Sequence, residues 1–142
     1  MKAYIAIKYH PNQSNRQAID GISTALERIG WQTTCVVRDL EKWGQVHYSA
    51  QELMREAFRI IDSSDAAVID LTEKGVGLGI EAGYAFAQGV PIITIAREGS
   101  DISTTLRGIS RNVLFYNDYD ELVDLFAGVL GMIQMDRRKG SI

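Results

Sequence analysis

The chain has 142 residues, of which 46% are apolar and 23% charged, and its net charge is −3. That balance, without a basic stripe, argues against duplex nucleic-acid binding, and no apolar run approaches the roughly 20 residues of a membrane span. Cys35 is the single cysteine, so an internal disulfide and a cysteine-based zinc cluster are excluded. The composition predicts a cytoplasmic protein with a core of its own.

Short apolar runs alternate with amphipathic stretches along the chain. The predicted strands cover residues 3–7, 33–37, 66–69, 92–96 and 113–116. Each is followed by a predicted helix, at about 15–29, 50–61, 80–88, 103–108 and 118–135. This alternation predicts one α/β domain over residues 1–136, a doubly wound five-stranded parallel sheet in flavodoxin-like order with helices on both faces. Residues 137–142 are predicted to be a frayed basic tail.

Local signals support several of these boundaries. Gly30 is expected to end the first helix, and Ser49 with Glu52 has the spacing of a capping box at the start of the second. Residues 66–69 form a continuous apolar run, which is typical of a central parallel strand covered on both faces. Ligands of such sheets bind beyond the carboxyl ends of the strands. The loops at residues 8–16, 70–81 and 97–108 are expected to meet there.

A glycine-rich segment precedes the third predicted helix, with Gly75, Gly77 and Gly79 at alternate positions. Glycines let a backbone approach a ligand closely, and the start of a helix offers unpaired N–H groups to an anion. The spacing matches neither a dinucleotide fingerprint nor a P-loop. A ligand cradle and a flexible connection therefore both remain open on spacing alone.

Glu81 is predicted to lie in the first turn of that helix. The helix dipole would stabilise its carboxylate there by roughly 0.3–1 kcal/mol and so keep it ionised. Its simplest interpretation is a routine acidic residue of a first turn. An ionised carboxylate beside bare backbone is also suited to attack on an anomeric carbon, because the transition state there resembles an oxocarbenium ion.

Three segments of the chain resemble a known family: residues 65–72 (DAAVIDLT), 77–87 (GLGIEAGYAFA) and 91–93 (PII). Together they are similar to the nucleoside 2-deoxyribosyltransferase superfamily, and nearest to its 2′-deoxynucleoside 5′-monophosphate N-glycosidases. In that branch a strand is followed by G-x-G-x-E-x-G-x-A, and the resemblance implies that Glu81 is the nucleophile. It also implies that Tyr4 lies beside the sugar and the base.

The resemblance extends to the substrate phosphate. Residues 103–108 (STTLRG) are similar to the S-x-x-I-R-G of the branch, which implies a homodimer in which Ser103 reaches the phosphate in the neighbouring subunit. Arg107 would bind phosphate or pair with an acidic side chain. Lys8 and His10 stand where the branch has a serine and an arginine, and Gly75 stands where it has a serine.

Two acidic positions leave alternatives open. The second carboxylate of the family aligns with Ala57, so Glu56 is the candidate for that role after a one-residue slip in the loop that follows. Asp70 ends the third predicted strand, and it would either hydrogen-bond a ribose hydroxyl or cap nearby backbone N–H groups. His10 and His47 lack metal-ligand spacing, so no metal is expected.

The leading hypothesis is hydrolysis of the N-glycosidic bond of (2′-deoxy)nucleoside 5′-monophosphates to free base and sugar 5-phosphate. The alternatives are base exchange between deoxynucleosides and non-catalytic nucleotide binding. No cofactor is expected, and the expected partners are a small nucleotide or nucleoside and a second copy of the chain.

Overall fold

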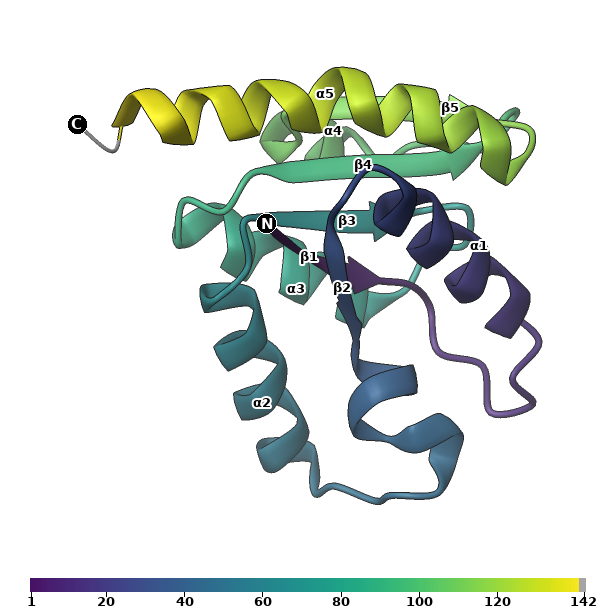
Figure 1. The fold of residues 1–142 in the computed structure, drawn as a ribbon. Helices are drawn as coiled ribbons and strands as arrows, with labels where there is room; N and C mark the ends of the chain where they lie inside the picture. The colour runs from purple at the N-terminus through teal and green to yellow at the C-terminus, as the bar shows by residue number, and fades with distance from the viewer. Residues whose placement is uncertain (141–142) are drawn as a thin grey trace.

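The structure, a computed structural model, describes residues 1–140 and contains one five-stranded, all-parallel sheet (Figure 1). Its strands run in the order β2-β1-β3-β4-β5, which is the flavodoxin-like order that the sequence predicts. Their bounds are β1 (Lys2–Ala6), β2 (Gln32–Cys35), β3 (Ala66–Asp70), β4 (Ile92–Arg97) and β5 (Asn112–Tyr116). The predicted fold class is therefore confirmed.

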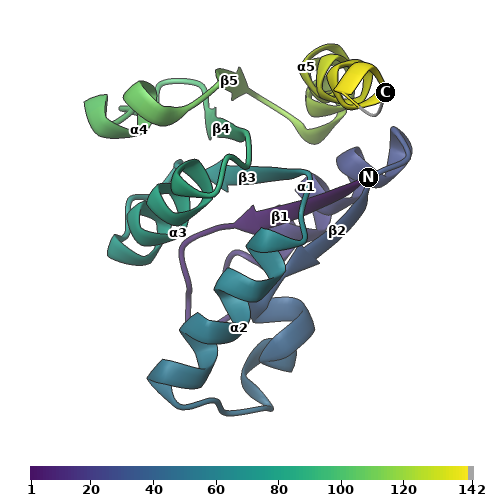
Figure 2. The ribbon, with the colours of Figure 1, turned by 90° about the vertical axis from the view of Figure 1, so that its left-hand side faces the viewer.

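Helices cover both faces of the sheet (Figure 2). One face carries α1 (Arg16–Arg28) and α5 (Tyr119–Gly140). The other carries α2 (Ala50–Asp62), α3 (Val76–Ala87) and α4 (Thr104–Ile109). All five strands point the same way, so their carboxyl ends and the loops that follow them share one edge.

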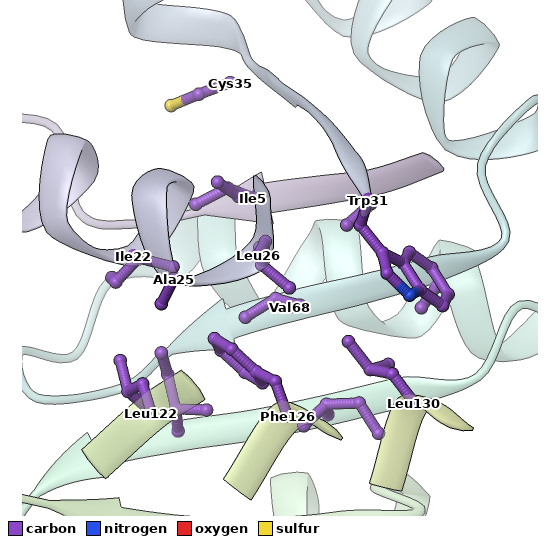
Figure 3. Packing of buried hydrophobic residues seen from close by; sticks show 14 of the residues in the cluster. Ile5, Ile22, Ala25, Leu26, Trp31, Cys35, Val68, Leu122, Phe126 and Leu130 are labelled. Atoms are coloured by element: carbon purple, nitrogen blue, oxygen red, sulfur yellow. The ribbon is translucent and has the colours of Figure 1, made fainter. Parts of the chain in front are cut away.

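Two apolar cores hold these layers together, one on each side of the sheet. In β3, Val68 faces α1 and α5, whereas Ile69 faces α2 and α3, and both are fully buried. This alternation follows from the two-residue period of a strand. Leu26 and Phe126 pack against Val68 in the first core (Figure 3). A central strand covered on both faces accounts for its unbroken apolar sequence.

Two of the predicted helix boundaries are confirmed in detail. The Ser49 side chain accepts a hydrogen bond of 3.2 Å from the backbone N–H of Glu52 at the start of α2. Gly30 follows α1 with φ of +88°, a left-handed conformation that glycine adopts without steric cost.

The second predicted strand is too long. Strand β2 ends at Cys35, and residues Val36–Leu40 form the π-helical turn η1, followed by the 3₁₀ turn η2 (Lys42–Gly44). Asp39 explains the change, because its carboxylate accepts a hydrogen bond of 2.8 Å from the backbone N–H of Cys35. Arg38 pairs with Asp39 and donates to Ser23 of α1, which holds the turn against that helix.

Helix α5 continues to Gly140, whereas the sequence places the start of a frayed tail after Asp136. Arg111 donates to Asp136 at 2.9 Å, and Arg137 pairs with the buried Asp65. These ion pairs tie the last turns to the amino-terminal edge of the sheet. Residues 141 and 142 of the predicted tail lie outside the described residues. No helix within residues 1–140 is long and apolar enough to cross a membrane.

Candidate functional site

A cavity of about 320 Å³ opens at the carboxyl ends of β1 and β2, beside the start of α3. This volume is within the range of small-molecule sites. Its lining combines apolar side chains with a few polar ones, among them Tyr4, Lys8, Glu41 and Glu81. The site therefore lies at the edge of the sheet where the sequence predicts it.

Tyr4 and Glu81 meet in the wall of this cavity. The hydroxyl of Tyr4, a fully buried side chain of β1, donates a hydrogen bond to Oε1 of Glu81 on α3. Burial raises the pKa of Glu81 to about 7, and the Tyr4 hydrogen bond partly opposes that rise. Burial and the neighbouring carboxylate raise the pKa of Tyr4 well above its usual range, so Tyr4 remains a proton donor. The resemblance places these two residues in one site, and the structure brings them into contact.

The helix dipole explanation for Glu81 is wrong. Helix α3 begins at Val76 instead of about Ile80, so Glu81 lies beyond its first turn, which contains no acidic residue. A carboxylate at that position gains little from the dipole, whose effect is confined to the first turn. Desolvation dominates instead, and it favours the neutral carboxyl over the ion.

The glycine segment is mostly helical and does not form a loop. Gly75 is the extended residue before α3, while Gly77 and Gly79 lie inside the helix. Gly75 and Gly77 line the cavity, and Gly79 is exposed outside it. A Cβ added at Gly75 would lie 3.6 Å from the Lys8 side chain, which is an ordinary van der Waals contact, so Lys8 passes close to the helix start. Neither the cradle nor the flexible connection describes all three residues.

The first loop and Asp70 line a second cavity of about 260 Å³ that adjoins the first at Lys8. His10 belongs to this second cavity, where it pairs with Glu73. The carboxylate of Asp70 accepts from the backbone N–H of Thr72 at 2.8 Å and from the Tyr116 hydroxyl at 2.9 Å. Its side chain therefore anchors the loop to β5, which agrees with the capping interpretation.

Glu56 is not brought into the cavity, which corrects the expected role. Its carboxylate binds Arg59 at 2.7 Å on the outer side of α2, and Ala57 faces the core. One residue on a helix is a rotation of about 100°, so Glu56 and Ala57 face different ways.

Ser103 and Arg107 also lie away from both cavities of their own chain. Ser103 precedes α4, where its hydroxyl is 2.6 Å from that of Thr105, and Arg107 is exposed on the same helix.

Comparison with known proteins supports the resemblance seen in the motifs. No protein-family model matches the chain. A protein of Thermofilum pendens with the provisional name 2′-deoxynucleoside 5′-phosphate N-hydrolase 1 is 26% identical over 146 residues, covering 95% of this chain and 99% of that protein. The chain resembles the nucleoside 2-deoxyribosyltransferase superfamily.

Two solved structures with that chemistry share the fold. A 2-deoxyribosyltransferase of Bacillus psychrosaccharolyticus superimposes with a TM-score of 0.68 at 13% identity, over 87% of this chain and 90% of that one. The CMP N-glycosidase of Clostridium botulinum superimposes with a TM-score of 0.59 at 19% identity, over 89% of this chain and 98% of that one. A CheY-like receiver domain of Methanospirillum hungatei superimposes with a TM-score of 0.54 at 10% identity, over 94% of this chain and 96% of that one. Proteins outside the superfamily therefore share this fold, so the function must be inferred from the residues of the site.

One residue of the site was missed by the motif comparison with the superfamily. Glu41 lines the cavity from the turn after η1, and burial raises the pKa of its carboxyl while His47 partly opposes that rise. Leu53 and Met54 of α2 add an apolar wall. Glu41 lies in an irregular segment without a recognisable spacing, so sequence periodicity carried no signal for it.

Proposed function

We propose that this protein hydrolyses the N-glycosidic bond of (2′-deoxy)nucleoside 5′-monophosphates and releases the free base and the sugar 5-phosphate. The observation that carries the proposal is the largely buried carboxyl of Glu81, which accepts a hydrogen bond from the Tyr4 hydroxyl in the wall of a cavity of about 320 Å³. The named activities of the similar proteins belong to the same reaction class.

Glu81 would act as the nucleophile. Its Oε2 or Oε1 attacks C1′, the bond between C1′ and the base nitrogen breaks, and an ester joins the sugar to the enzyme. Water then attacks C1′, the ester bond breaks, and the carboxylate is restored. The Tyr4 hydrogen bond favours the ionised form of Glu81 that attack requires. Since the pKa is about 7, a large fraction of the enzyme carries that form at neutral pH.

Lys8 would hold the substrate phosphate. It lies at the junction of the two cavities and passes close to Gly75, at the start of α3. An ammonium group and the unpaired N–H groups at the start of a helix both attract a dianion. This arrangement favours a nucleotide over a bare nucleoside and so favours hydrolysis of monophosphates over base exchange.

The proposed working unit is a homodimer in which Ser103 completes the neighbour's phosphate site. Helix α3 presents an apolar outer face, where the exposed fractions are 83% for Val76, 50% for Ile80 and 57% for Phe86. Glu81 is its one charged residue, and it points into the cavity. A twofold contact along such a face would bury apolar area and make the two sites equivalent.

Base release from dAMP, dGMP, dCMP and dTMP tests the proposal directly. We expect free base and an equal amount of 2-deoxyribose 5-phosphate from at least one of them, and no release by Glu81→Gln. Transfer of deoxyribose from unphosphorylated nucleosides to added adenine would instead indicate base exchange. Nucleotide binding without turnover would indicate the non-catalytic alternative.

A further inference from the structure

A departing base needs a proton, and Glu81 cannot supply it while it attacks C1′. When the glycosidic bond breaks, its electron pair remains on the base nitrogen, and protonation of that nitrogen stabilises the leaving group. Tyr4 is unsuited to this task, because its hydroxyl already donates to Glu81 and burial raises its pKa far above the usual range. A second proton donor is therefore required.

The cavity offers few other candidates. Besides Glu81, its titratable lining residues within the described chain are Tyr4, Lys8, Tyr9, Cys35 and Glu41. Cys35 is buried and its pKa is raised to about 11, which makes it a weak acid. Tyr9 is 49% exposed, and Lys8 faces both cavities. Glu41 is the second carboxyl group of the lining.

The backbone at Glu41 is firmly fixed. Its N–H donates to Val36 O at 3.0 Å, and its carbonyl accepts from the N–H groups of Gly44 at 3.0 Å and Val46 at 2.9 Å. Lys42, Trp43 and Gly44 follow with φ of 48°, 59° and 91°. For the two non-glycine residues this left-handed conformation costs free energy, and such costs concentrate at functional sites. The turn holds Glu41 at the rim of the cavity.

The carboxyl of Glu41 is uncommitted, unlike those of Asp39 and Glu56. Asp39 pairs with Arg38, and Glu56 pairs with Arg59. Within residues 1–140, no hydrogen bond or salt bridge to protein engages the Glu41 carboxyl, and His47 acts on it through its charge alone. Burial favours its neutral form, which is the form that donates a proton.

From this placement we infer that Glu41 is the proton donor to the leaving base and, in the second half of the reaction, the proton acceptor from water. The inference rests on the proposed hydrolysis. In the first step Glu81 forms the ester with C1′, the base leaves with the electron pair, and the Glu41 proton moves to the base. In the second step the oxygen of a water molecule attacks C1′, the ester bond to Glu81 breaks, and the Glu41 carboxylate takes the proton of that water, which restores both groups.

The two carboxyl groups line one cavity, and the proposed reaction requires Glu81 to be ionised while Glu41 is protonated. Tyr4 donates to Glu81, which stabilises the negative charge on that carboxyl during the attack on C1′. The charged groups around the pair are Lys8 from the first loop and His47 from the loop before α2.

The test compares Glu41→Gln with wild type on two substrates: the deoxynucleotide that wild type cleaves best and 4-nitrophenyl 2-deoxyriboside 5-phosphate, whose leaving group departs without protonation. We expect the rate on the nucleotide to fall about 10²- to 10⁴-fold, the usual contribution of general acid catalysis. Formation of the glycosyl-enzyme from the nitrophenyl substrate, seen as a burst of nitrophenol, should stay within a few-fold of wild type. Glu98→Gln, the same change at an exposed position outside both cavities, should match wild type on both.

A second readout is the pH dependence of nucleotide cleavage. Loss of the Glu41 proton lowers the wild-type rate at high pH, and Gln cannot titrate, so that alkaline limb should disappear in Glu41→Gln. A Glu41→Gln rate near wild type on the nucleotide overturns the inference, and so does equal loss of the nitrophenol burst in a variant that melts like wild type. Failure of wild type on both substrates, or full activity of Glu81→Gln, would instead overturn the proposed hydrolysis.

Discussion

Tyr4 on β1 donates its hydroxyl hydrogen bond to Glu81 on α3, across 77 residues of sequence. The bond joins the first strand, β1, to α3, the helix that follows the third strand, and both elements line the cavity. Figure 1 shows the positions of β1 and α3 in the fold. Burial holds the pKa of Glu81 near 7, and the Tyr4 hydrogen bond keeps it from rising further. This pair sets the charge state of the proposed nucleophile, so several predictions depend on it.

Replacement of Glu81 by Gln should abolish turnover and preserve nucleotide affinity. The carboxylate acts on charge that develops at C1′ in the transition state, so its loss lowers kcat more than it weakens binding. We expect kcat to fall on the order of 10³-fold or more, with a dissociation constant for dCMP, measured by calorimetry, within a few-fold of wild type. A parallel loss of affinity and turnover would contradict the assignment of Glu81 as nucleophile.

Replacement of Tyr4 by Phe should move the acidic limb of the pH–rate profile to higher pH. The Tyr4 hydrogen bond lowers the pKa of Glu81, so its removal raises that pKa, and a higher pH is then needed to ionise the nucleophile. The profile of kcat/KM reports the free enzyme and gives the shift directly. An unchanged acidic limb in a folded Tyr4→Phe protein would show that Glu81 does not set it.

Glu81 should also make the folded protein less stable as the pH rises. Its pKa increases from 4.5 to about 7 on folding, so the folded state binds the proton more tightly. The resulting stability is present below about pH 4.5 and is lost as the pH rises through 7.

Glu81→Gln should lack this pH dependence. At pH 8 it should be more stable than wild type by up to about 3 kcal/mol, and near pH 4 the two should be similar. Urea unfolding at the two pH values measures the difference, and Glu98→Gln serves as the exposed control. Wild-type stability that does not fall relative to Glu81→Gln between pH 4 and 8 would contradict the raised pKa.

Mixing two inactive proteins should restore activity if subunits share sites. Glu81→Ala lacks the nucleophile but retains Ser103, whereas Ser103→Trp obstructs the neighbour's site but retains Glu81. A mixed dimer then contains one intact site, and an equal mixture should recover about a quarter of wild-type activity. Absence of recovery despite demonstrated subunit exchange, or a monomer in sedimentation at working concentration, would contradict the shared site.

Gly21 on α1 should not tolerate alanine, because a Cβ there would lie 2.6 Å from the ring of Tyr119 at the start of α5. We expect Gly21→Ala to destabilise the protein by about 1–3 kcal/mol through overpacking. Gly128→Ala, on the exposed side of α5 with open space around it, should be neutral or stabilising by up to about 1 kcal/mol. Thermal melts of both variants measure the difference, and equal effects would contradict the packing argument.

The amino-acid sequence alone determined the alternation of strands and helices, the parallel sheet and the edge at which the cavity lies. Those features depend on local patterns: apolar runs such as residues 66–69, the Ser49 cap and the positive φ of Gly30. The motif around Glu81 also pointed to the carboxylate that the structure places in the cavity wall. Each is carried by neighbouring residues, so periodicity and motif spacing suffice to find it.

Only the tertiary structure decided which side chains share the cavity. Tyr4 meets Glu81 because parallel pairing sets β1 beside β3, and the π-helical turn held by Asp39 brings Glu41 to the rim. Glu56 turns away from the cavity by one helical position. The pKa of Glu81 follows from burial, which depends on packing from several elements and not on its place in one helix. Contacts between distant segments and the desolvation they cause are properties of the folded chain, so no local pattern encodes them.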